Sequence, residues 1–227
     1  DHYQSLRVSQ GYAHLGVGVL FDDGGDDIYE GESLVQGAAS MGIGLLMDLS
    51  GNDAYRTFNY AQGFGWVQGV GIAWDGGGDD TWYANPGIVD GEGIVLFSSA
   101  QMVGEGASSF SQGAGFGLRG QSTYLSGGLG VLRDVSGDDT YMAGVFAQGT
   151  GYWQGTGILA DGDGADTYDA FYYAQGGAAH YAIGMLTDDG NGDDRLNTLL
   201  SPRAMQFGAG HDFSLGLFIN EGGNDEY

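Results

Sequence analysis

The octapeptide Asp134-Val135-Ser136-Gly137-Asp138-Asp139-Thr140-Tyr141 follows the pattern Asp-x-x-Gly-x-Asp-x-aromatic, and this pattern recurs along the chain. Further copies occupy Asp22 to Tyr29, Asp48 to Tyr55, Asp75 to Trp82 and Asp161 to Tyr168. Looser copies occupy Asp188 to Leu196 and Asn220 to Tyr227. Clustered Asp, Gly and Ser residues are typical of tight turns, so each copy predicts a turn that is followed by an aromatic residue. We call this turn the acidic corner.

The acidic corners recur at a regular interval. A period of 26 to 28 residues joins most of them, while 59 residues separate Asp80 from Asp139. Their last aspartates, which we call the closing aspartates, are Asp1, Asp27, Asp53, Asp80, Asp139, Asp166, Asp194 and Asp225. A fixed period in this range is the sequence signature of a repeat architecture. The sequence therefore predicts one repeat array over residues 1–227.

A glycine-containing segment precedes each acidic corner, as in Gly155-Thr156-Gly157-Ile158-Leu159. Its alternation with period two predicts a β-strand. A Gln-Gly step, as at Gln148-Gly149, marks a second corner in each repeat. We expect the glycines to leave space for the aromatic side chains. We expect the glutamines to form a stacked network of side-chain amides.

Two strands and two corners per repeat predict an all-β, single-domain β-solenoid, like a parallel β-helix or β-roll, of about eight coils. Regular coils are expected over residues 1–82 and 128–227. Residues 83–127 are interpreted as a degenerate coil, with Gly91 to Leu96 as its strand, followed by an insertion from Leu118 to Ser126. One β-hairpin per repeat is the alternative fold. It would give corners of alternating length, whereas these corners are uniformly short.

Composition narrows the class of protein. The chain contains 47 glycines, yet 42% of its residues are hydrophobic and 13% are aromatic, which argues against disorder. The net charge of −24 disfavours binding to nucleic acid or to an anionic membrane surface. There is no cysteine, so disulfide bonds contribute nothing to stability.

The charge of the acidic corners predicts bound cations. Stacked coils would place equivalent carboxylates about 5 Å apart, where each pair repels by roughly 3 to 4 kcal/mol at a dielectric constant near 20. The chain has no lysine, and an all-oxygen site suits Ca²⁺. The alternative is that each aspartate closes its own turn by hydrogen bonds, without metal. The predicted Ca²⁺ ligands, between successive coils, are Asp22, Asp27, Asp48, Asp53, Asp75, Asp80, Asp134, Asp139, Asp161, Asp166, Asp188, Asp194 and Asp225.

Three of the turns resemble the glycine- and aspartate-rich nonapeptides of RTX proteins. They begin at Gly24-Gly25, Gly77-Gly78 and Gly222-Gly223. The resemblance is limited to the acidic corners, and the period here is longer than the RTX period. It implies a parallel β-roll in which Ca²⁺ lies between adjacent turns, bound by turn carbonyls and by the closing aspartates. It also implies folding on export into a calcium-rich medium.

The sequence predicts a structural rather than a catalytic role, because identical carboxylate pairs in every repeat argue against a single tuned active site. We expect an extracellular or cell-surface stalk, matrix component or filament unit. It would bind calcium ions and self-associate, head to tail or through an apolar sheet face. The alternative is a β-solenoid that binds or cleaves a polysaccharide at the degenerate coil, near Phe97 and the insertion from Leu118 to Ser126.

Overall fold

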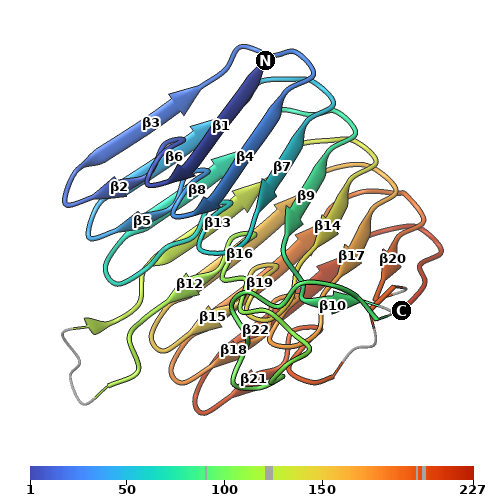
Figure 1. Cartoon of the computed structure of the whole chain (residues 1–227). Coiled ribbons are helices and arrows are strands. Elements are labelled where there is room, and N and C mark those ends of the chain that lie inside the picture. Colours follow the sequence, from blue (N-terminus) through green and yellow to red (C-terminus); the bar gives the residue numbers. More distant parts are fainter. Residues whose placement is uncertain (90, 121–124, 198, 201–202) are drawn as a thin grey trace.

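The chain folds as a stack of coils with no α-helix in the part that the structure describes (Figure 1). This computed structural model describes residues 1–89, 91–120, 125–197, 199–200 and 203–227. Strands of successive coils pair in parallel and in register, as β13 (Leu129–Arg133) does with β16 (Thr156–Asp161). Parallel pairing confirms the predicted all-β solenoid and excludes one antiparallel hairpin per repeat.

Two seven-stranded parallel sheets face each other across the core. The aromatic sheet contains, in spatial order, β1 (His2–Arg7), β4 (Ile28–Ser33), β7 (Ala54–Thr57), β9 (Thr81–Ala84), β14 (Thr140–Met142), β17 (Thr167–Asp169) and β20 (Arg195–Leu196). The glycine sheet contains β3 (Val17–Phe21), β6 (Ile43–Met47), β8 (Val70–Trp74), β13, β16, β19 (Ile183–Asp188) and β22 (Leu215–Asn220). The acidic corner joins the glycine sheet of one coil to the aromatic sheet of the next.

Short strands line the glutamine corner, and a separate pair lies outside the stack. The corner strands are β2 (Ala13–His14), β5 (Ala39–Ser40), β12 (Gly115–Phe116), β15 (Gly151–Tyr152), β18 (Ala178–Ala179) and β21 (Gly210–His211). The outlying pair, β10 (Ile88–Val89) and β11 (Glu92–Gly93), is antiparallel. Among the described residues, no helix has the length and hydropathy needed to span a bilayer.

The core between the sheets is a stack of aromatic rings against a column of leucines. The rings of Tyr29 and Tyr55 are parallel with centroids 4.8 Å apart, and those of Tyr141 and Tyr168 are 4.9 Å apart. All are fully buried against residues such as Leu132. Offset stacking of aromatic rings at this separation adds to the free energy gained by burial, so the aromatic column stabilises every coil.

The glycine column has a different cause from the one that the sequence suggested. A Cβ atom on Gly157 would lie 2.1 Å from the carbonyl oxygen of Thr150, in the glutamine corner of the same coil. The equivalent Gly44 and Gly130 meet the carbonyl oxygens of Ala38 and Ala114 in the same way. The glycines therefore make room for the folded-in backbone of the glutamine corner, and not for the aromatic rings.

The glutamines also bond differently from the expected amide stack. Gln112 Nε2 donates to the carbonyl oxygens of Trp82 and Met142, at 2.7 and 3.0 Å, and the equivalent glutamines bridge two successive strands of the aromatic sheet in the same manner. A buried backbone carbonyl needs a donor, and the accepting carbonyls lie within or at the end of these strands, as Trp82 does in β9 and Met142 in β14. The glutamine side chain supplies those donors, and it does not bond to the next glutamine.

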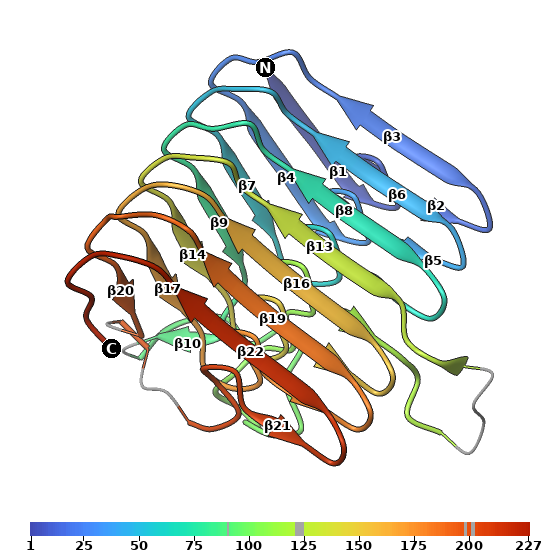
Figure 2. The same cartoon turned by 180° about the vertical axis from the view of Figure 1, so that it is seen from behind.

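The described residues form seven coils, where about eight were expected. The fourth coil begins at β9, leaves the stack at Pro86, returns near Ala107, and continues through Gln112 and β12 to β13. The segment Gly91 to Leu96 joins neither large sheet, because β8 pairs directly with β13 and β9 with β14. Residues 83–127 thus hold no degenerate coil, but one coil with two excursions. The second excursion is the predicted insertion from Leu118 to Ser126, of which residues 121–124 lie outside the described part (Figure 2).

Replacing a glycine of the glycine column by a larger residue should destabilise the coil that contains it. We expect Gly157→Ala to lower the free energy of unfolding by about 3 kcal/mol, because the added methyl group overlaps backbone that cannot rotate away. Gly16→Ala is the matched control, since its Cβ atom would come no closer than 3.8 Å to the nearest atom. Urea unfolding followed by circular dichroism measures both. Equal stability of the two variants would contradict the packing described here.

Candidate metal centre

The acidic corner gathers the predicted aspartates into two buried columns along one edge of the solenoid. The first aspartate of each turn, which we call the opening aspartate, is at most 1% exposed in Asp48, Asp75, Asp134, Asp161 and Asp188. The closing aspartates Asp27, Asp53, Asp80, Asp139, Asp166 and Asp194 are at most 2% exposed. Asp22 and Asp225, at the two ends of the columns, are partly exposed. Burial of so many carboxyl groups requires partners for their oxygens.

One oxygen of each closing aspartate is bonded to the neighbouring coil. The backbone N–H of Asp80 donates to Asp139 Oδ1 at 2.7 Å, and the N–H of Asp139 donates to Asp166 Oδ1 at 2.7 Å. The same bond recurs from Asp27 to Asp225 along the stack. The alternative to metal binding was that each aspartate closes its own turn by hydrogen bonds. This oxygen does bond to the backbone, but the bond joins two coils and does not close a single turn.

The other oxygen of the closing aspartates has no such partner. The Oδ2 atoms of Asp27, Asp53, Asp80, Asp139 and Asp166 are buried and accept no hydrogen bond. A buried carboxylate oxygen without a donor costs free energy, unless it binds a cation or takes up a proton. A cation or a proton is therefore expected at these five oxygen atoms.

The opening aspartates are held by their own turn and by the aromatic column. Gly77 N–H donates to Asp75 Oδ1 at 2.8 Å, and the hydroxyl of Tyr55 donates to Asp75 Oδ2 at 2.5 Å. In the fourth coil the indole N–H of Trp82 replaces the tyrosine hydroxyl and donates to Asp134 Oδ2 at 2.8 Å. Sequence reasoning missed this role of the aromatic residues, although every aromatic that follows a turn is a Tyr or Trp and none is a Phe.

Opening and closing aspartates converge between successive coils. In each group, three carboxylate oxygens lie within 4.8 Å of one another. The groups among the described residues are Asp22–Asp27–Asp48, Asp53–Asp75–Asp80, Asp80–Asp134–Asp139, Asp139–Asp161–Asp166 and Asp166–Asp188–Asp194. Asp225 belongs to none of them, although it accepts a bond from Asp194 N–H at 3.1 Å. Carboxylate oxygens at this spacing fit the bond lengths of about 2.3 to 2.6 Å in Ca²⁺ sites, where each ion takes six to eight oxygens.

The electrostatics of these groups favour a bound positive charge. Burial, followed by repulsion from Asp134 and Asp161, raises the pKa of Asp139 to about 11. Burial and the charge of Asp75 raise the pKa of Asp80 to about 9. Burial also raises the pKa of Asp166 to about 9. Protons on these carboxyl groups relieve the repulsion between them, and a metal ion that bound there would displace those protons.

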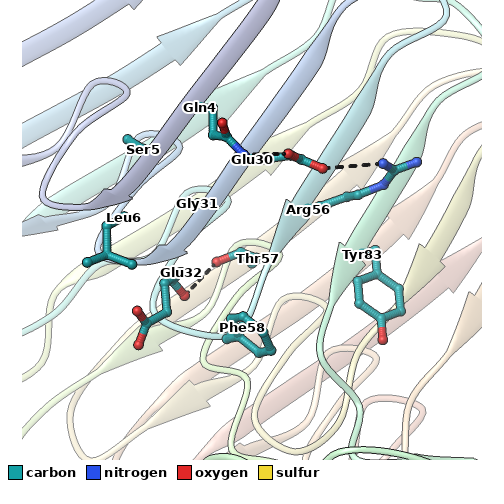
Figure 3. A pocket seen from close by; sticks show the side chains of 10 residues that line it. All are labelled: Gln4, Ser5, Leu6, Glu30, Gly31, Glu32, Arg56, Thr57, Phe58 and Tyr83. Carbon is teal, nitrogen blue, oxygen red and sulfur yellow. Dashed lines mark hydrogen bonds and ion pairs between the residues drawn. The ribbon is translucent and has the colours of Figure 1, made fainter.

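A second feature is a depression of about 350 Å³ on the outward face of the aromatic sheet (Figure 3). The half-buried rings of Phe58 and Tyr83 line it together with Glu30, Glu32 and Arg56. Glu30 accepts from Arg56 at 3.5 Å and from Gln4 at 3.3 Å. Neither Phe97 nor any described residue of the insertion from Leu118 to Ser126 lines the depression. No spacing in the sequence points to the lining residues, because they come from four different coils.

The fold and the site together define the class of protein. The chain is a parallel β-solenoid with clusters of buried acidic residues along one corner, which is compatible with RTX-like turns. No protein family, no curated protein and no solved structure was found to match it. Its function is therefore inferred from the site.

Stability of the metal-free protein should fall as the pH rises. The folded chain retains protons on Asp80, Asp139 and Asp166 that the unfolded chain releases near pH 4. Unfolding therefore releases protons above that pH, so the melting temperature in EDTA should decrease steadily from pH 5 to pH 9. Asp139→Asn should make this decrease smaller. A melting temperature that is constant or rises over the same range would contradict the pKa assignments.

Proposed function

We propose that the chain is a non-enzymatic structural protein, an extracellular or cell-surface β-solenoid that Ca²⁺ stabilises along its acidic corner. It would serve as a stalk, a matrix component or a head-to-tail filament unit. The observation that carries the proposal is the column of buried, unpartnered Oδ2 atoms on the closing aspartates, such as that of Asp139. A hard cation between coils would bind these oxygens and remove the repulsion between them.

Two adjacent positions of the acidic corner, the closing aspartate and the residue before it, differ in whether they require a negative charge. The residue before the closing aspartate accepts a bond from the next coil in five of the corners, as Asp138 Oδ1 does from Ala165 N–H at 2.9 Å. That exposed position is Asn52 in one coil and Ala165 in another, so it does not need a negative charge. The closing position is aspartate in every coil, although asparagine would accept the same backbone bond.

The extracellular setting follows from the chemistry of such sites. Carboxylate sites in extracellular modules bind Ca²⁺ with dissociation constants of about 10⁻⁴ to 10⁻³ M, and the ion concentration outside cells is sufficient to fill them. Head-to-tail association would extend the same ladder. β1 and β3 are the outer strands at one end of the stack, and β20 and β22 at the other, so a further coil, from a longer chain or from another copy, would pair with the strands at either end.

Calcium should stabilise the fold, and its removal should weaken it. We expect EDTA to lower the melting temperature at pH 7.5. Added Ca²⁺ should restore at least about 2.7 kcal/mol of stability for each site, at a free concentration near 100 times its dissociation constant. Differential scanning calorimetry and circular dichroism measure the change. The same melting temperature in EDTA and in Ca²⁺ would refute the proposal.

Substitutions at two neighbouring residues distinguish a loss of ion binding from a change in the backbone of the turn. Asp139→Asn removes one ligand of two adjacent groups and should lose much of the stabilisation by Ca²⁺. Asp138→Asn keeps the backbone bond at an exposed position and should respond to Ca²⁺ as the unmodified chain does. If both variants respond equally to the ion, the closing aspartates are not its ligands.

The depression on the aromatic sheet favours a second candidate function, the binding of a neutral polysaccharide. Phe58 and Tyr83 offer ring faces to the C–H groups of a sugar, while Glu30, Glu32 and Arg56 offer hydrogen bonds to its hydroxyls. The net charge of −24 disfavours an acidic polysaccharide.

Substitution of the ring residues tests this candidate. Phe58→Ala and Tyr83→Ala should each weaken binding to a neutral polysaccharide about tenfold or more, as measured by affinity electrophoresis. Tyr181→Ala, which removes an exposed ring at another corner, should leave binding unchanged. Binding that survives both substitutions in the depression would exclude it as the sugar site.

A further inference from the structure

The outward face of the glycine sheet is a broad apolar surface. Residues that alternate with the buried glycines and leucines point away from the core, and in-register pairing aligns them in three columns. The columns are Val17, Ile43, Val70, Leu129, Thr156, Ile183 and Leu215; Val19, Leu45, Ile72, Val131, Ile158, Met185 and Leu217; and Phe21, Met47, Trp74, Arg133, Ala160, Thr187 and Ile219. Arg133 is the only charged residue in the three columns.

This face is most open to solvent at its two ends, where Val19 is 60% exposed and Leu215 50%. The outward residues of the central strands, such as Ile72 and Ile158, are half-buried, and Thr187 is buried. In Figure 2 the seven strands lie side by side in front of the molecule, and no described segment crosses over them. Monomeric proteins rarely expose a continuous apolar patch of more than about 300 to 600 Å².

The size of the face matches that of a protein interface. Seven strands at about 4.8 Å and five residues at about 3.3 Å give a plane of about 550 Å², before the relief of the side chains is counted. Two such planes would bury about 1,100 Å² in total, which exceeds the area of about 1,000 Å² expected of a biological interface and lies just below the usual range of stable, specific ones. A smaller occupant would leave part of the face exposed.

We propose that this face pairs two copies of the chain in a two-fold dimer. The ridges of side chains recur at the strand spacing, and a second copy presents ridges with the same spacing over the same length. Rows from one sheet can therefore pack between rows of the other, with the two sheets about 10 Å apart. The surface is used by both copies alike, as in the isologous dimers that are the commonest oligomers.

Charge selects the orientation of the pair. The acidic corners run along one edge of the face, and the chain carries a net charge of −24. A two-fold axis parallel to the strands would place the two acidic edges together, and their repulsion would oppose association. An axis parallel to the stacking direction places each acidic corner opposite the partner's glutamine corner. We infer this second arrangement, in which the central column, including Ile72 and Ile158, lies along the axis.

The mass of the protein in solution tests the dimer. Sedimentation equilibrium in excess Ca²⁺ should give twice the chain mass of 23.6 kDa at about 50 μM, the concentration range of moderate-affinity dimers. Ile72→Lys should give monomers, because the two introduced charges would meet at the axis. Met142→Lys, which points outward from the aromatic sheet, is the matched control and should remain dimeric. A monomeric unmodified chain, or a dimeric Ile72→Lys, would overturn the proposal.

Further measurements distinguish the loss of the interface from misfolding of the variant, and determine the orientation of the two copies. If circular dichroism shows that Ile72→Lys does not fold, Ile158→Thr replaces it, and its dissociation constant should rise about tenfold. Unchanged affinity in that variant counts against the face. Because the chain has no cysteine, a spin label at Asp138→Cys gives the orientation. The inferred arrangement places the two labels about 20 Å or more apart, whereas adjacent acidic edges would bring them to about 10 Å.

The result does not depend on the calcium proposal. If EDTA leaves the melting temperature unchanged and the chain still forms the dimer, the ion sites are refuted and the apolar interface is supported. Head-to-tail growth is distinguished as well, since it gives masses beyond two chains and is unaffected by Ile72→Lys.

Discussion

The spacing of stacked parallel strands is the constraint on which this structure depends. Every residue lies one strand spacing from its own equivalent in the next coil, so each coil repeats the chemistry of its neighbour. For aromatic rings this proximity is favourable, and Tyr29 stacks on Tyr55 at 4.8 Å. For carboxylates it is unfavourable, and the acidic corner concentrates that cost along one edge. Protons or metal ions must compensate for it, because the chain has few positive charges of its own.

The aromatic and acidic columns are coupled through hydrogen bonds. Tyr55 belongs to the core, yet its hydroxyl is fixed on Asp75 in the acidic corner. Tyr168 reaches Asp161 and Asp188, which lie on opposite sides of one coil boundary. Core packing and the geometry of the carboxylates therefore stabilise each other. Asp80, Asp139 and Asp166 each belong to two neighbouring groups, and burial together with repulsion from nearby aspartates raises the pKa of all three.

Repetition made much of this structure predictable from sequence. Recurrence of Asp139 and Tyr141 at a fixed period was sufficient for the solenoid, the two kinds of strand and the convergence of the aspartates. About eight coils were expected and seven are found, because Gly91 to Leu96 resembles a strand locally, while pairing of β8 with β13 is a property of distant segments. The reason for the glycines was also wrong. A contact between Gly157 and the carbonyl of Thr150 depends on how the corner folds inward, which no spacing in the sequence expresses.

The fourth coil carries two excursions, yet its strands keep the same register as those of every other coil. The boundaries between coils use recurring contacts: a carboxylate on a backbone N–H throughout, and a ring on a ring at most of them, with Leu196 in place of the ring at the last. A whole coil can therefore be added or removed without changing the partners at the new junction. The interactions that hold the stack together set its cross-section and leave its length unspecified.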